Sequence, residues 1–296
     1  MLLDDPDMKT AVFIVLKVIA LTIILFICFG VAGSVLGFQG DSQSPEEAGA
    51  AATALLAVCL LNTIVLTYII LRSRWTGWRL IAAISFVYYG VTTFMSQIES
   101  AVFITRLPPG MLSRLFLMGA LIAVPFSALA VLILGKRKAK TVDTESNERL
   151  ITPVREWSWK LAVIAVAYLI LYFTFGYYIA WRNPAVPEYY GGTDPGSFFA
   201  QMSTVLRDTP WLVPFQILRA MLWTLIALPV VRMMKGSWFE TALAVALLFS
   251  VVMNSQLFLP NPYMPDAVRM AHLVETASSN FIFGFLIGWL LSKRYG

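Results

Sequence analysis

The sequence predicts an all-α, polytopic membrane protein, a helical bundle of about eight transmembrane helices. Hydrophobic residues make up 58% of the 296 residues and charged residues only 13%, which is far from the composition of a soluble domain. The apolar residues form separate blocks of about 20, the length at which a helix crosses roughly 30 Å of hydrocarbon. Because a backbone facing lipid must satisfy its own hydrogen bonds, and period-two alternation is absent, each block is expected to be helical.

The predicted spans follow one another along the chain, and all but two of the connections between them are short. They cover residues 11 to 37, 51 to 71, 80 to 104, 111 to 134, 157 to 181, 211 to 231, 239 to 258 and 271 to 291. The first block is too long for the core of a typical signal peptide and follows acidic rather than basic residues, so we expect it to be a retained span.

Basic residues gather in alternate connections, which predicts the orientation because Lys and Arg are retained on the cytoplasmic side. They follow the second, fourth, sixth and eighth spans: Arg72, Arg74, Arg79; Lys136, Arg137, Lys138, Lys140; Arg232, Lys235; and Lys293, Arg294. The first connection has Asp41, Glu46 and Glu47 and no basic residue. We expect a bacterial inner (cytoplasmic) membrane with both termini in the cytoplasm. The net charge of +5 is then a topology signal, and no nucleic acid partner is expected.

The two halves of the chain share several features, which predicts a four-helix repeat. Each half has a Trp near the start of its third span, a Gln near the end of that span, and a Pro and an Arg around the start of its fourth. These are Trp78, Gln97, Pro109 and Arg114 in one half, and Trp238, Gln256, Pro265 and Arg269 in the other. We expect a first repeat at residues 1–135, a polar cytoplasmic linker at 136–156, and a second repeat at 157–296. An even number of helices makes the repeats parallel, with an axis along the membrane normal.

The long outer connection from Arg182 to Pro210 contains a helical pattern. Asp194 and Pro195 are expected at the N-cap and first turn. The apolar residues that follow at helical spacing are Phe198, Phe199, Met202, Val205 and Leu206. This predicts a short amphipathic helix on the outer membrane surface, with a lid as the alternative.

Ionisable residues inside membrane spans are candidates for function because they are costly to bury. Lys17 and Lys160 lie near cytoplasmic ends, where the ammonium is expected to reach the interface. Four deeper residues share one layer near the outer ends of their spans: Glu99, Arg114, Arg219 and Glu275. Their common depth predicts a polar layer in the outer leaflet.

Polar side chains form stripes at this level. His272, Glu275, Thr276 and Ser279 lie on one face of the eighth span, with Asn280 beside them. In the third span Tyr88, Thr92, Ser96 and Glu99 share a face, and Gln97 points about 100° away. Asn254 and Gln256 end the seventh span at the same level. We predict a polar chamber open to the outside, made by Ser96, Gln97, Glu99, Asn254, Gln256, His272, Glu275, Ser279 and Asn280.

Three kinds of chemistry fit these residues. Glu99, His272 and Glu275 could bind a cation or a proton, since neighbouring carboxylates in a low dielectric exchange protons. The same three residues could bind a divalent metal that activates water, although the chain has one histidine and no His-Glu-x-x-His pattern. Finally, the acids could pair with Arg114 and Arg219 as structural ion pairs. Apart from such a metal, no cofactor is expected.

The leading functional hypothesis is a transporter-like protein that binds a small solute or ion at this site. A membrane-embedded hydrolase or lipid-modifying enzyme, with or without a metal, is the first alternative, and the small molecule could then be a lipid. A scaffold or assembly subunit is the second. The sequence contains no Gly-x-Ser-x-Gly, Walker or dinucleotide-binding motif, so the question of enzymatic activity stays open.

Overall fold

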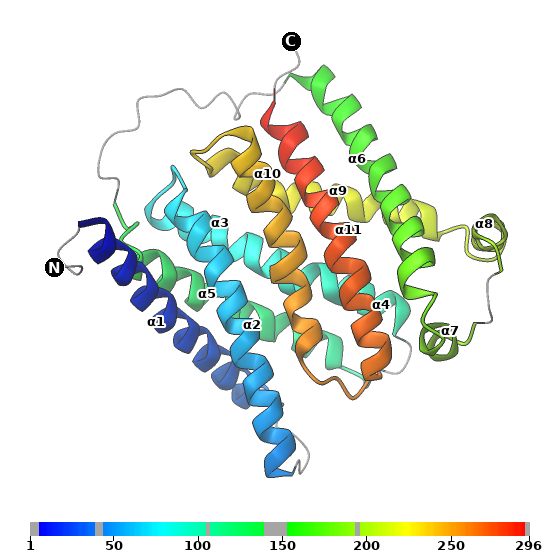
Figure 1. The fold of residues 1–296 in the computed structure, drawn as a ribbon, viewed down its shortest axis with the longest axis horizontal. Helices are drawn as coiled ribbons and strands as arrows, with labels where there is room; N and C mark the ends of the chain where they lie inside the picture. Colours follow the sequence, from blue (N-terminus) through cyan, green and yellow to red (C-terminus); the bar gives the residue numbers. More distant parts are fainter. Residues whose placement is uncertain (1–5, 39–43, 105–106, 139–152, 193–195, 294–296) are drawn as a thin grey trace. The chain divides into compact units, whose positions relative to one another are not determined.

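The fold consists of helices that cross the membrane, with two shorter helices in the connection after the fifth of them (Figure 1). The computed structural model describes residues 6–38, 44–104, 107–138, 153–192 and 196–293, and these contain no β-strand. Eight helical segments among them are long and apolar enough to span a membrane: Lys9–Val35, Pro45–Leu71, Gly77–Phe103, Met111–Ile133, Val154–Ala180, Leu212–Met233, Trp238–Phe258 and Asp266–Ser292. The predicted fold class and the number of spans are confirmed.

The chain divides into two compact units, Met1–Asp143 and Thr144–Gly296, which we call the amino-terminal and carboxyl-terminal units. Each unit contains four of the eight candidate spans. The division falls within the segment 136–156 that the sequence suggests as a linker, although most of that segment lies outside the described residues. The repeat relating the two units stays a prediction.

The amino-terminal unit is built from α1 (Pro6–Val35), α2 (Pro45–Leu71), α3 (Gly77–Tyr89), α4 (Met95–Phe103) and α5 (Met111–Ile133). A π-helical turn at Gly90–Phe94 joins α3 and α4 into one span. Helix α2 begins at a capping box in which Ser44 and Glu47 each accept a hydrogen bond from the other's backbone N–H. Helix α1 packs against α2 and α5, and α3 packs against α5.

The carboxyl-terminal unit contains α6 (Val154–Phe175), α7 (Ala185–Tyr190), α8 (Phe198–Asp208), α9 (Leu212–Met233), α10 (Trp238–Leu247) and α11 (Asp266–Ser292). A π-helical turn at Gly176–Ala180 continues α6. A second π-turn at Leu248–Val252, followed by a 3₁₀ turn at Ser255–Phe258, continues α10. Helix α6 packs against α9 and α11, and α10 packs against α11. The first and fourth spans, and the third and fourth spans, therefore pair in both units.

Glycines bring α10 and α11 unusually close together, and Figure 1 shows the two helices side by side. A Cβ added at Gly288 would lie 2.5 Å from the Cα of Ala242, and one at Gly284 would lie 2.7 Å from the carbonyl oxygen of Val245. Small residues allow such close packing of membrane helices. The crossing fixes the position of α11, which carries the predicted polar stripe.

The predicted helix in the outer connection exists, and its N-cap prediction is wrong. Residues Phe198 to Leu206 lie on α8, but its N-cap is Ser197, whose hydroxyl accepts a hydrogen bond from the Ala200 N–H at 3.2 Å. Gly196 has a φ of +68°, which prevents the helix from starting earlier. Asp194 and Pro195 lie outside the described residues. The sequence did not predict α7, and the placement of α8 on a membrane surface stays a prediction.

The side chain of Lys160 is buried within the protein, with 1% exposed, and the expected position of its ammonium at the membrane interface stays a prediction. Its ammonium lies 2.7 Å from a carboxylate oxygen of Glu156 and also donates to the carbonyl oxygen of Lys293 at 2.7 Å. Glu156 lies one turn earlier on α6, so it supplies a counter-charge that makes burial tolerable. This pair joins the start of α6 to the end of α11.

Candidate functional site

Helix α11 begins at Asp266, five residues before the predicted boundary at 271. An Nη2 atom of Arg269 lies 2.7 Å from Oδ1 of Asp266, and Arg269 also donates to the carbonyl oxygen of Leu257. These contacts extend the helix beyond its apolar part and tie it to the end of the preceding span. His272 and Glu275 therefore lie within the helix and not in a loop.

Glu275, His272 and Tyr190 form a continuous chain of hydrogen bonds. Oε2 of Glu275 lies 2.8 Å from Nδ1 of His272, and Nε2 of the same ring lies 3.1 Å from the hydroxyl of Tyr190, the last residue of α7. The Glu275 side chain is only 10% exposed and that of His272 20%. A carboxylate, an imidazole and a phenol thus lead from the buried face of α11 to the end of α7.

The chemistry of these groups fixes the direction of each hydrogen bond. An ionised carboxylate only accepts, so Nδ1 of a neutral His272 carries the proton and donates to Glu275. Nε2 then has a free lone pair and accepts the hydrogen bond from Tyr190. When His272 is protonated, Nε2 becomes a donor and the Tyr190 hydroxyl must accept instead. The orientation of Tyr190 therefore depends on the proton content of the Glu275–His272 pair.

Helix α7 holds Tyr190 in place through contacts with the start of α11. Val186 is fully buried and packs with Val268 of α11. The hydroxyl of Tyr189 donates to the carbonyl oxygen of Tyr263 at 2.6 Å. Because α7 has only six residues, its position depends on these contacts, and they bring the Tyr190 hydroxyl to His272.

A second polar contact joins α11 to the end of the seventh span. The Thr276 hydroxyl donates to Oδ1 of Asn254, and Nδ2 of Asn254 donates to the carbonyl oxygens of Ser250, at 2.8 Å, and Phe249, at 3.1 Å. Both carbonyls belong to the π-turn Leu248–Val252. The Ser250 hydroxyl donates to the carbonyl oxygen of Ala277 at 2.7 Å. Asn254 therefore satisfies backbone groups of the π-turn while binding the polar stripe.

The π-turn Gly176–Ala180 borders the other side of this stripe. A Cβ added at Gly176 would lie 3.8 Å from Oε1 of Glu275, so the carboxylate reaches the backbone of the turn. Both π-turns of this unit pack against α11. Such turns occur frequently at functional sites, because they leave the regular hydrogen-bond ladder of the helix. The polar stripe of α11 thus lies between two irregular turns.

The predicted residues of the carboxyl-terminal unit differ in what they contact. Asn280 is buried and its Nδ2 lies 3.0 Å from the sulfur of Met253. The Ser279 hydroxyl donates to the carbonyl oxygen of Thr276 at 3.4 Å, and Gln256 donates to Met253 at 3.3 Å, so both bond to their own helical segments. Their contact with a solute stays a prediction.

The predicted residues of the amino-terminal unit lie on α4 and the start of α5. Glu99 and Gln97 are half-buried on α4, and Ser96 accepts a hydrogen bond from the Ser100 hydroxyl through its carbonyl oxygen at 3.0 Å. The guanidinium of Arg114 donates to the carbonyl oxygen of Leu36. The chamber that would join Glu99 to Glu275 spans both units and stays a prediction, as does a pairing of Glu99 with Arg114.

Arg219 is buried in α9, with 3% of its surface exposed. Its Nη1 donates to Oε1 of Gln216 at 3.0 Å, and its guanidinium carbon lies 5.8 Å from the ring centre of Tyr168. A pairing of Arg219 with Glu275 stays a prediction.

Within the part of the chain that the structure describes, no group of three or more His, Cys, Asp or Glu side chains could hold a metal ion. Two atoms that a metal would need as ligands, Nδ1 of His272 and Oε2 of Glu275, hydrogen-bond to each other instead. A metal at Glu99, His272 and Glu275 therefore has no support from the described geometry and stays a prediction.

The sequence did not reveal Tyr190 as part of the site. Tyr190 belongs to the outer connection, 82 positions from His272, and no periodic pattern relates the two residues. Comparison with known protein families, curated proteins and solved structures gives no match for this chain.

Proposed function

We propose that this chain is a transporter-like membrane protein that binds and releases a proton at the Glu275–His272 pair, in the outer leaflet. The observation that carries this proposal is the chain Glu275–His272–Tyr190, in which a buried Glu275 and a partly buried His272 lie in a membrane span. Ionisable residues within spans are costly, and series of Asp, Glu and His are typical of proton relays in pumps and transporters.

The three groups offer a route for a proton between a buried and an exposed position. A proton held by Glu275 or by Nδ1 of His272 needs to move only across a 2.8 Å hydrogen bond. On the other side of the ring, Nε2 faces the hydroxyl of Tyr190, a residue that is 37% exposed. Tyr190 thus provides the exit to water, and Glu275 the internal acceptor.

Neutral polar groups beside the pair support a role in solute binding. Asn254, Thr276 and Asn280 are all at least half-buried and lie along the same part of α11 or against it. Amides and hydroxyls of this kind orient small polar ligands in otherwise apolar sites. Protonation of the adjacent pair would change the charge that such a solute meets, which couples solute binding to the proton.

Proton movement in proteoliposomes tests the proposal. Vesicles containing the protein and a pH-sensitive dye receive an inside-negative potential from potassium and valinomycin. Wild-type protein should admit protons faster than empty vesicles, and Glu275→Gln should reduce the rate to that of empty vesicles. Glu188→Gln is the matched control, because Glu188 is an exposed acid on α7. Wild-type rates equal to those of empty vesicles would contradict the proposal.

A hydrolase is the second candidate, and the orientation of His272 favours it. Its Nδ1 faces the carboxylate of Glu275, and its Nε2 faces the hydroxyl of Tyr190. In nucleophilic catalysis a histidine base has the same two neighbours, a carboxylate that orients the ring and a hydroxyl that gives its proton to Nε2. On this hypothesis the purified protein should hydrolyse a p-nitrophenyl ester in micelles, and His272→Ala should abolish the reaction. Hydrolysis that survives the substitution would exclude His272 as the base.

A scaffold role makes a different prediction for the same variants. If Glu275 only stabilises the packing of α11, Glu275→Gln should lower the unfolding temperature in detergent while each folded molecule transfers protons as before. Measuring both quantities on one preparation separates this role from proton transfer.

A further inference from the structure

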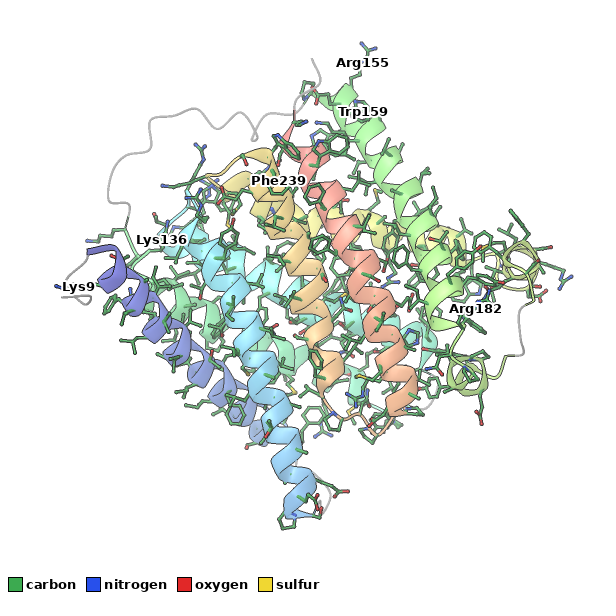
Figure 2. The ribbon with its side chains drawn as sticks, in the orientation of Figure 1. Lys9, Lys136, Arg155, Trp159, Arg182 and Phe239 are labelled. Carbon is green, nitrogen blue, oxygen red and sulfur yellow. The ribbon has the colours of Figure 1, made fainter. Side chains whose placement is uncertain are left out.

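Two connections of the amino-terminal unit meet at one end and form a single surface. The first segment, residues 72–79, follows α2 and includes the first residues of α3. The second segment, residues 134–138, follows α5. The N–H of Gly77 donates to the carbonyl oxygen of Lys136 at 2.8 Å, and the Lys136 ammonium donates to the carbonyl oxygen of Ser73 at 2.7 Å. Figure 2 labels Lys136 at the end of the unit where α3 begins. We call this surface the basic end.

Gly77 fixes the register of the two segments. Its φ is +58°, and a Cβ at this position would lie 3.0 Å from the carbonyl oxygen of Arg137. Both the backbone conformation and the close approach therefore require a glycine. The backbone of Gly77 and the ammonium of Lys136 thus hold the two basic segments together.

The charge of the basic end is of one sign. Its six cationic residues are Arg72, Arg74, Arg79, Lys136, Arg137 and Lys138, and neither segment contains an Asp or a Glu. Arg79, Arg137 and Lys138 are exposed. The Arg79 guanidinium lies over the Trp75 ring, 3.9 Å from its centre, which orients it while its charge faces solvent.

An exposed indole accompanies these charges at the boundary of the span. Trp78 is 81% exposed and lies in the first turn of α3. Indoles at the ends of membrane spans favour the level of the lipid headgroups. Cations clustered at the same level attract anionic lipids, and their guanidinium and ammonium groups bind phosphate oxygens.

We propose that the basic end is a binding site for the phosphate headgroup of an anionic phospholipid. Arg79, Arg137 and Lys138 contact the phosphate, and the Trp78 indole lies beside the upper acyl chain. The lipid comes from the membrane that the protein spans. This site is independent of the proton site on α11, because it uses only residues of the amino-terminal unit.

The corresponding connection of the carboxyl-terminal unit offers a contrast. The last turn of α9 and the connection to α10 have Arg232 and Lys235 as their basic residues, and Glu240 follows in the first turn of α10. The carboxylate of Glu240 lies against Gly236, where an added Cβ would meet Oε2 at 1.7 Å. This acid reduces the local positive potential, so we expect weaker lipid binding there.

Lipid binding by the full-length protein in detergent tests the proposal. The probes are palmitoyl-oleoyl phosphatidylglycerol and the matching phosphatidylcholine, and native mass spectrometry counts the bound molecules. Phosphatidylglycerol should bind preferentially. Each cation near the surface contributes about 1 kcal/mol, so the triple variant Arg79→Gln/Arg137→Gln/Lys138→Gln should weaken binding about a hundredfold.

A matched triple variant controls for the loss of charge. Arg155, Arg182 and Arg207 are exposed residues of the other unit. Because they lie outside the basic end, their replacement by Gln should leave phosphatidylglycerol binding within about twofold of wild type. If the test triple variant does not fold, Arg137→Gln and Lys138→Gln are measured singly, each with an expected loss of about fivefold.

Three results would overturn the proposal. The first is equal binding of the two lipids by the wild-type protein. The second is an equal loss in the test and control triple variants, which would indicate a general charge effect. The third is displacement of phosphatidylglycerol by millimolar sodium phosphate, which would indicate a site for free phosphate and not for a lipid.

Discussion

The two units pair their spans in a similar way but bury different kinds of polar residue. Among the described residues, every buried charged side chain belongs to the carboxyl-terminal unit: Glu156, Lys160, Arg219, Arg269 and Glu275. Among the described residues of the amino-terminal unit, the buried polar side chains carry hydroxyl or amide groups, as in Asn62, Thr63 and Ser127. A similar framework of spans thus supports an apolar core in one unit and a charged one in the other.

This difference indicates where the chemistry of the protein lies. Burying a charge is costly without a partner, and Lys160, Arg269 and Glu275 each have an ionisable partner three or four residues away on the same helix. Local pairs of this kind let a membrane helix carry charge without relying on distant residues. The amino-terminal unit instead presents its charge at the basic end.

Removing a buried ammonium should have the largest effect on stability. Lys160→Met removes the ammonium that lies 2.7 Å from the buried carboxylate of Glu156, and breaking a buried pair costs about 3–5 kcal/mol. Lys17→Met is the matched control, because Lys17 is half-buried and its ammonium lies over the Phe13 ring at 4.7 Å. Thermal unfolding in detergent measures both. Equal losses would show that the two units bury charge at similar cost.

Enlarging a glycine between α10 and α11 should have the next largest effect. Gly288→Leu forces a side chain against the Ala242 backbone, and overpacking of this kind costs about 1–3 kcal/mol. Gly30→Leu in α1 should be tolerated, since nothing lies within 4 Å of an added Cβ there. The comparison uses the unfolding temperature, and a similar decrease in the two variants would argue against the close crossing.

Two tyrosine substitutions separate function from packing. Tyr190→Phe removes the hydrogen bond to His272, so it should slow proton entry and cost about 1 kcal/mol of stability. Tyr88 is buried in the amino-terminal unit, where its hydroxyl accepts a hydrogen bond from Asn62 at 3.3 Å. Tyr88→Phe should lower stability to a similar extent and leave proton entry unchanged. If Tyr88→Phe slowed proton entry and Tyr190→Phe did not, the proton path would lie in the amino-terminal unit.

The smallest effect is expected for an exposed ion pair on α8. Arg207 hydrogen-bonds to Asp208 at 2.8 Å, which lowers the pKa of the Asp208 carboxyl. A lowered pKa in the folded state stabilises the protein above the ordinary pKa, and this contribution disappears as the pH falls through the folded value. Because both groups are exposed, Arg207→Gln should return the pKa toward its ordinary value without a measurable change in unfolding temperature. NMR titration of the carboxyl carbon checks the first effect.

The sequence predicted the spans well because apolar length is a local property. Its error at the start of α11 arose because Asp266 and Arg269 continue the helix beyond its apolar part through their own ion pair. The burial of Lys160 was not predicted for a related reason, since its partner Glu156 lies in the polar segment before the predicted span.

The candidate site was only partly predictable. The stripe of His272, Glu275 and Thr276 follows from helical spacing, and the structure adds the hydrogen bonds within it. Tyr190 could not be found, because it comes from a short helix whose position depends on tertiary contacts. The π-turns could not be found either, since their sequences, Gly176–Ala180 and Leu248–Val252, resemble ordinary apolar helix.

The most direct test of the proposed site is the tautomer of its histidine. The chain has a single histidine, so ¹⁵N-histidine labelling reports on His272 alone in NMR. At alkaline pH the proton should reside on Nδ1, with Nε2 unprotonated, and Glu275→Gln should alter this preference. A proton on Nε2 in the wild-type protein, or the same spectrum in Glu275→Gln, would contradict the proposed chain of hydrogen bonds.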